Sequence, residues 1–295
     1  MNALEELVDL LTLERVDGDV FQGGSVPADT RRVFGGQIAA QALAAACRTV
    51  PSGRLPHSLH AYFLWPGDPD TPIVYTVDRV RDGFSFTTRG VRAVQDGRPI
   101  FQLTASFQQA EEGRTHQEPM PEAPDPETLP TSDELLARHA HLFQDTAAVR
   151  RMSRLRAAVD LRYVADPPYA SAGEARAPHS QVWFRTNGKL DGELDDPATH
   201  LCLATYVSDM TLLDSVLLAQ GRGGWTVGDV VGASLDHSMW FHRAFRADEW
   251  LLYDQGSPTS QSSRGLAQGR MFTTEGALAV SVIQEGLVRP PRGRS

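Results

Sequence analysis

The sequence predicts an α+β fold in which two copies of one unit, a helix with an antiparallel sheet, join into one continuous sheet. Three observations carry this prediction. Long strand-like segments are separated by turn dipeptides typical of hairpins. A helix of very small residues precedes the first run of strands. The same pieces then recur in the same order in the second half, and two half-sheets with exposed edges are expected to pair with each other.

Residues 1–110 form the first predicted unit. Leu4, Leu7, Val8 and Leu11 have the spacing of one helix face. A second helix is expected within 33–50, where glycines and alanines make one side narrow enough for a sheet to close around it. Four strands follow, at 58–66, 71–81, 84–95 and 99–108, with turns at Pro66-Gly67-Asp68, Asp82-Gly83 and Asp96-Gly97.

Residues 111–154 are expected to form a linker followed by a helix. The linker segment is acidic and rich in proline, so it is not expected to form a regular core element. A polar helix over 134–155 then leads into the second unit.

Residues 155–290 form the second predicted unit. Strands at 159–165 and 181–186 precede a helix at 198–213, and four further strand-like segments follow. Three of these match the first unit in kind: an aromatic-rich strand in each half, an Arg-Gly strand (Arg89-Gly90 and Arg264-Gly265), and a last strand that ends in glutamine (Gln108 and Gln284).

Composition excludes several classes of function. A net charge of −9 argues against binding to nucleic acid, which needs clustered lysine and arginine. No apolar run is long enough for a membrane-spanning helix, and the acidic start lacks the pattern of a signal peptide. The two cysteines, Cys47 and Cys202, exclude a disulfide framework and are expected to be reduced thiols in a cytoplasmic protein.

A serine, an aspartate and a histidine stand within four positions in Ser234-Leu235-Asp236-His237. On one strand Ser234 and Asp236 would share a face while His237 points to the other, so the imidazole could not lie between them. The segment also lacks the second glycine of the nucleophile elbow. We therefore expect no serine-nucleophile triad here.

The motifs VFGGQIAAQAL, HSLHAYFLWPGDPDTPIVY, RDGFSF, GRPIFQLTASFQ, YVSDMTLL, LDHSMWFHR, EWLLY and VIQEG occur in an order that resembles the acyl-CoA thioesterase II family. They cover roughly residues 20–110 and 159–287. The resemblance implies a double-hotdog fold, each hotdog being a long helix wrapped by an antiparallel sheet. It also implies hydrolysis of fatty acyl-CoA to a free acid and coenzyme A, without a cofactor.

The resemblance further implies a catalytic group of aspartate, threonine and glutamine that activates water. These roles fall on Asp209 of YVSDMTLL, on Ser234 in place of the threonine, and on Gln284 of VIQEG. Serine keeps the hydroxyl but loses the stiff side-chain torsion of a branched residue. Periodicity alone does not choose between Asp209 and Asp214, because both lie within the apolar arc of the helix. His57 is expected to be structural.

Two rival functions remain at this point. A hydratase or dehydratase of the same fold would use an Asp-x-Asn-Pro-x-His segment, which the sequence lacks. A non-catalytic acyl-CoA sensor would have no need of Asp209 and Gln284. The expected partner is the acyl-CoA substrate, with Arg31, Arg32 and the basic tail Arg289 to Arg294 as candidates for its phosphates. The exposed sheet edges also predict a homo-oligomer.

Overall fold

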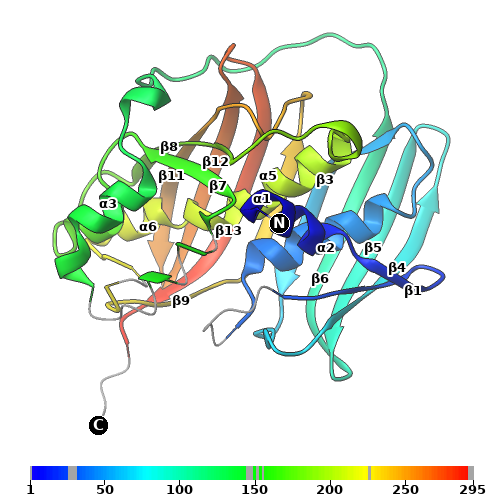
Figure 1. Ribbon diagram of the computed structural model, residues 1–295, viewed down its shortest axis with the longest axis horizontal. Helices are drawn as coiled ribbons and strands as arrows, with labels where there is room; N and C mark the ends of the chain where they lie inside the picture. Colours follow the sequence, from blue (N-terminus) through cyan, green and yellow to red (C-terminus); the bar gives the residue numbers. More distant parts are fainter. Residues whose placement is uncertain are drawn as a thin grey trace.

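Thirteen strands form one antiparallel sheet whose concave side holds two central helices (Figure 1). The computed structural model describes residues 2–25, 32–143, 149–150, 153–154, 156–224 and 227–291. The first half contributes α1 (Ala3–Leu11), β1 (Glu14–Asp17), β2 (Val20–Gly23), α2 (Gly35–Cys47), β3 (Arg54–Phe63), β4 (Ile73–Asp82), β5 (Phe86–Gln95) and β6 (Arg98–Gln109).

The second half repeats this plan after a connecting segment. It contains β7 (Val159–Tyr163), β8 (His179–Thr186), α5 (Pro197–Thr211), α6 (Asp214–Ala219), β9 (Val231–Ser234), β10 (Asp236–Phe241), β11 (Leu251–Gln261), β12 (Arg264–Thr273) and β13 (Leu278–Arg289). The order of the strands across the sheet is β1-β2-β4-β5-β6-β3-β10-β13-β12-β11-β8-β7, with β9 paired to β13. The predicted double hotdog is therefore confirmed.

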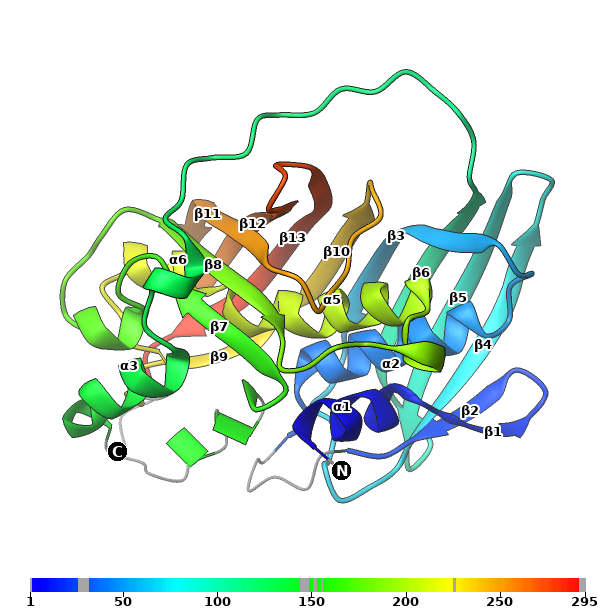
Figure 2. The same ribbon diagram turned by 45° about the horizontal axis from the view of Figure 1, so that its top comes forward.

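The two half-sheets join through β3 and β10, which pair antiparallel from Asp236 opposite Tyr62 to Trp240 opposite Ser58. This junction removes one free edge from each half. Figure 2 shows α2 and α5 lying side by side across the joined sheet. The start of α2, at Gly35 and Gly36, meets the end of α5 at Tyr206 and Asp209.

Small residues let the two central helices approach closely. The alanines of α2 are almost all buried, and an added Cβ at Gly36 would lie 2.4 Å from the carbonyl oxygen of Tyr206. Any larger side chain at Gly36 would push α5 away. The sequence Gly35-Gly36 thus fixes the contact between one helix from each half.

The connecting segment differs from the expectation of a plain linker and one helix. In the described residues, the predicted helix over 134–155 is divided into the short α3 (Ser132–Arg138), the 3₁₀ turn η2 (Ala140–Leu142) and helical residues at 149–150, 153–154 and 156. The proline-rich part contains a further turn, η1 (Pro126–Thr128). Its side chains Met120, Ala123 and Leu129 pack on a second apolar cluster, formed by Trp183, Trp250, Leu252 and Phe272.

This second cluster lies on the convex side of the second half-sheet, because Val182, Phe184, Leu251 and Tyr253 on the alternate positions belong to the main core. The linker therefore covers that face, and its hydrogen bonds from Gln117 to Gly276 and from Trp183 to Pro124 hold it there. A proline-rich segment forms few backbone hydrogen bonds within itself, so its contacts with the sheet fix its position.

Among the described residues, one helical stretch, Pro197–Ala219, is long and apolar enough to cross a membrane. Burial accounts for this composition, since 89% of its most apolar window lies inside the fold.

Candidate active site

Asp209 lies in the last turn of α5 and receives hydrogen bonds from two strands of the second half. Ser234 Oγ, at the end of β9, donates to Asp209 Oδ1 over 2.9 Å. Gln284 Nε2, on β13, donates to the same oxygen over 2.5 Å. The structure thus brings together the three residues that the sequence nominated.

The start of α2 completes the site from the first half. The residue before the helix, Phe34, supplies no side-chain cap, and the amide of Gly36 donates to the Asp209 carboxylate instead. An added Cβ at Gly35 would lie 2.6 Å from Asp209 Oδ2, so this oxygen faces the helix start directly. The sequence predicted Gly35-Gly36 to lie on a narrow helix side but did not predict their contact with Asp209, although a glycine pair at a helix start already indicates a close approach.

Burial raises the pKa of the Asp209 carboxyl, and the hydrogen bonds from Gln284, Ser234 and the Gly36 amide oppose that shift. A desolvated carboxylate held by three donors is oriented and more basic than an exposed one. Gln284 is fully buried, and its Oε1 has no partner among the described residues. That oxygen remains as an acceptor for a molecule bound beside Asp209.

The apparent triad has three separate sets of partners. Ser234 bonds to Asp209, while Asp236 Oδ1 accepts a hydrogen bond from the Glu285 amide. His237 Nε2 lies 2.7 Å from Ser208 Oγ, and burial lowers the pKa of His237 to about 4. Its imidazole is therefore neutral at pH 7, and it is bonded to the residue next to Asp209 rather than to Ser234.

One detail of the strand prediction was wrong. Ser234 and His237 both bond to residues of α5 and so lie on the same side of the sheet. The reason is a break at Leu235, which separates β9 from β10 and whose backbone bonds to both Glu285 and Phe63. The irregularity shifts the alternation by one residue.

Asp214 and His57 lie apart from this group. Asp214 accepts a hydrogen bond from Tyr163 over 2.9 Å, and burial raises the pKa of its carboxyl to about 6. His57 lies near the start of β3, and its Nε2 is 2.9 Å from Ser106 Oγ. It is six residues before Phe63, whose ring borders Gly35 beside Asp209. Contacts across the fold thus distinguish Asp209 from Asp214, which periodicity did not.

Of the arginines proposed to bind phosphate, the structure describes Arg32 and Arg289. Arg32 donates to the Gly232 carbonyl, and Arg289 ends β13 opposite Val231. Arg31 and 292–295 lie outside the described residues.

Two family profiles match the two halves of the chain. Residues 25–108 match the acyl-CoA thioesterase N-terminal domain, and residues 153–287 match acyl-CoA thioesterase. The chain belongs to the acyl-CoA thioesterase II family. As a member of it, the protein is an acyl-CoA thioester hydrolase.

Relatives of this thioesterase are similar over nearly its whole length. Acyl-coenzyme A thioesterase 8 of Homo sapiens is 40% identical over 95% of this chain and 88% of its own length. Acyl-CoA thioesterase 2 of Haemophilus influenzae is 37% identical, over 97% of this chain and 98% of its own. The crystal structure of acyl-CoA thioesterase II TesB2 from Mycobacterium marinum superposes with a TM-score of 0.78 at 41% identity, covering 97% and 99% of the two chains.

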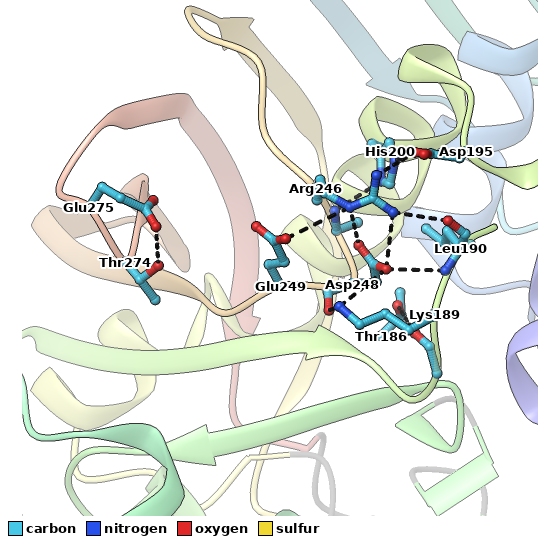
Figure 3. Close-up of polar contacts among 12 residues, drawn as sticks. Thr186, Lys189, Leu190, Asp195, His200, Arg246, Asp248, Glu249, Thr274 and Glu275 are labelled. Atoms are coloured by element: carbon cyan, nitrogen blue, oxygen red, sulfur yellow. Dashed lines mark hydrogen bonds and ion pairs between the residues drawn. The ribbon is translucent and has the colours of Figure 1, made fainter.

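A separate cavity of about 290 Å³ lies toward the other end of α5 in this thioesterase. Arg246 lines this cavity, and Figure 3 shows its side chain bonded to Asp195, Asp248 and the Leu190 carbonyl. His200, which also bonds to Asp195, is nine residues from Asp209, or about 14 Å along the helix. Four carboxylates and two cations are gathered here, namely Asp195, Asp248, Glu249 and Glu275 with Lys189 and Arg246. This excess of negative charge opposes the phosphates of coenzyme A.

Proposed function

We propose that the thioesterase hydrolyses fatty acyl-CoA by direct attack of a water molecule that Asp209, Ser234 and Gln284 hold. The observation that carries this proposal is that Ser234 and Gln284 donate to one oxygen of a buried carboxylate. Asp209 Oδ1 is thereby saturated, and Oδ2 is left to accept a proton at the start of α2.

In the proposed reaction the water donates one hydrogen bond to Asp209 and the other to Gln284 Oε1. Its oxygen attacks the thioester carbonyl carbon as Asp209 takes the proton. The first-turn amides of α2 other than that of Gly36 are suited to stabilise the oxyanion, because they have no acceptor within the helix. Collapse of the intermediate breaks the carbon–sulfur bond, and the thiolate, with an ordinary pKa near 8.5, leaves and takes the proton from Asp209, which restores the carboxylate.

Thiol release from decanoyl-CoA tests this assignment. Asp209→Ala is expected to abolish release, whereas Asp236→Ala, which removes a nearby carboxylate outside the group, should retain it. Full activity in Asp209→Ala would refute the role of Asp209.

The hydrogen bond from Ser234 to the Asp209 carboxylate would also suit a covalent route, so a second experiment separates the two. Intact-mass measurement after rapid acid quench should show no acylated protein during turnover, and Ser234→Ala should keep measurable activity. An acyl group trapped on Ser234, with complete loss of activity in Ser234→Ala, would establish the covalent route instead.

We also propose that the protein assembles as a homo-oligomer in the cytoplasm. The linker covers the convex face of the second half-sheet, whereas the first half presents Tyr62, Trp65 and Phe84 with exposed fractions of 64, 53 and 96%. Exposed apolar side chains such as these favour burial against another copy. Sedimentation velocity tests the assembly, and a monomer at micromolar concentration would refute it. The free thiols Cys47 and Cys202 suit a reducing compartment, which cell fractionation tests.

A further inference from the structure

An exposed arginine lies beside the strand that carries Ser234. One guanidinium nitrogen of Arg32 donates to the carbonyl oxygen of Gly232 over 3.4 Å. Gly232 is two residues before Ser234 on β9, or roughly 7 Å along the strand. Arg32 is also three residues before Gly35, so it stands where the backbone enters the first turn of α2.

The charge of Arg32 is free for a ligand. Among the described residues no carboxylate forms an ion pair with it, whereas Arg246, Arg264 and Arg270 are each bonded to acidic side chains. A guanidinium has five N–H donors, and the Gly232 carbonyl occupies one of them. The remaining fork matches the geometry of a phosphate.

The substrate needs such a charge at this place. Coenzyme A carries several phosphate charges, and the chain as a whole is at −9, so the average field repels it. The cavity beside Arg246 has two glutamates, Glu249 and Glu275, in its lining, and the nearest cation, Arg246, is already bonded to Asp195 and Asp248. Beside β9, Arg289 lies across the ladder from Val231, next to Gly232, and adds a second positive charge.

We propose that Arg32 binds a phosphate of the coenzyme A moiety and so gives the enzyme its preference for acyl-CoA over shorter thioesters. This proposal rests on the hydrolysis at Asp209. The thioester would lie at the start of α2 beside Asp209, and the pantetheine arm would pass outward along β9 to the exposed guanidinium.

Two thioesters with the same acyl chain test it: decanoyl-CoA, and decanoyl-N-acetylcysteamine, which lacks the phosphates. The measured quantity is the ratio of kcat/KM for the first substrate to kcat/KM for the second. Loss of a charge-assisted hydrogen bond should lower this ratio about tenfold in Arg32→Ala. Arg32→Lys, which keeps the charge but not the fork, should lower it less.

The matched control is Arg92→Ala, since Arg92 is an exposed arginine on β5 whose neighbours Val91 and Ala93 face the core. Its ratio should equal that of the unaltered protein. An unchanged ratio in Arg32→Ala, including an equal loss on both substrates, would overturn the proposal, as would an equal fall in Arg92→Ala. Absence of hydrolysis of either substrate by the unaltered protein would instead count against the reaction at Asp209.

Discussion

A methyl group at Gly35 is expected to displace the Asp209 carboxylate, the proposed general base, without destabilising the helix. Gly35 is the first residue of α2, and alanine is favoured over glycine within a helix by up to about 1 kcal/mol. The new Cβ, however, would lie 2.6 Å from Asp209 Oδ2 and 3.0 Å from the Phe63 ring. Ordinary contact begins near 3.4 Å, so the carboxylate must retreat by the difference, 0.8 Å.

That retreat acts on the bonds of 2.9 Å from Ser234 and 2.5 Å from Gln284 to the same carboxylate. A misplacement of about 1 Å in a catalytic group costs roughly 100-fold in rate, or about 2.7 kcal/mol of activation free energy. We therefore expect Gly35→Ala to lower kcat for decanoyl-CoA by about 100-fold, while the melting temperature stays within a few degrees of the original.

The assay is steady-state thiol release, with a thermal melt of the same preparation. Gly90→Ala is the control, because a Cβ there would meet its nearest neighbour, Val80, at 3.6 Å. Activity of Gly35→Ala within threefold of the original protein would refute the reasoning. It would mean either that the site has room for a methyl group or that Asp209 needs no fixed position.

Three further predictions concern the carboxylates. Ser234→Thr should keep kcat within threefold because it retains the hydroxyl, whereas Ser234→Ala should lower kcat about tenfold by removing a hydrogen bond to a charged group, both measured by thiol release. The Gln284 hydrogen bond lowers the pKa of Asp209, so in Gln284→Ala the acidic limb of the kcat/KM profile should move to higher pH; no movement would contradict the contact. Burial raises the pKa of Asp214 from 3.8 to about 6, so the native state loses stability as pH rises through that window, by about 3 kcal/mol. Urea unfolding from pH 4 to 7 should show this loss in the original protein, and in Asp214→Asn the loss over that range should be smaller by about 3 kcal/mol.

The sequence was sufficient for the fold because its turn signals are local. Asp82-Gly83 and Asp96-Gly97 lie at or beside the turns of the β4–β5 and β5–β6 hairpins, with Asp96 and Gly97 both at positive φ as such a turn requires. The linker was harder to predict, because Met120, Ala123 and Leu129 make contacts with distant strands. A proline-rich composition gives no sign of which surface it will cover.

The site was predictable only in part, for a similar reason. The motif nominated Asp209, but helix periodicity placed Asp214 on the same arc, and only the hydrogen bonds from β9 and β13 separate the two. The strand alternation failed at Leu235, where a break between β9 and β10 turns Ser234 and His237 to the same side. Both points depend on residues more than 20 positions away in the chain.

Asp209 also links the two halves, because its carboxylate accepts the hydrogen bond from the Gly36 amide at the start of α2, where Phe34 provides no side-chain acceptor. This structural use has a cost, since burial raises the pKa of its carboxyl and so disfavours the ionised form that a base needs. A folded-state pKa above the unfolded value means that native stability falls as pH rises through that interval. Asp209→Asn removes the ionisation at the expense of about one hydrogen bond, worth about 1 kcal/mol. Its stability relative to the original protein should therefore increase from pH 4 to pH 7 in urea unfolding, while thiol release is lost. If the difference in unfolding free energy between Asp209→Asn and the original protein were constant across that range, burial would not disfavour the ionised form of Asp209.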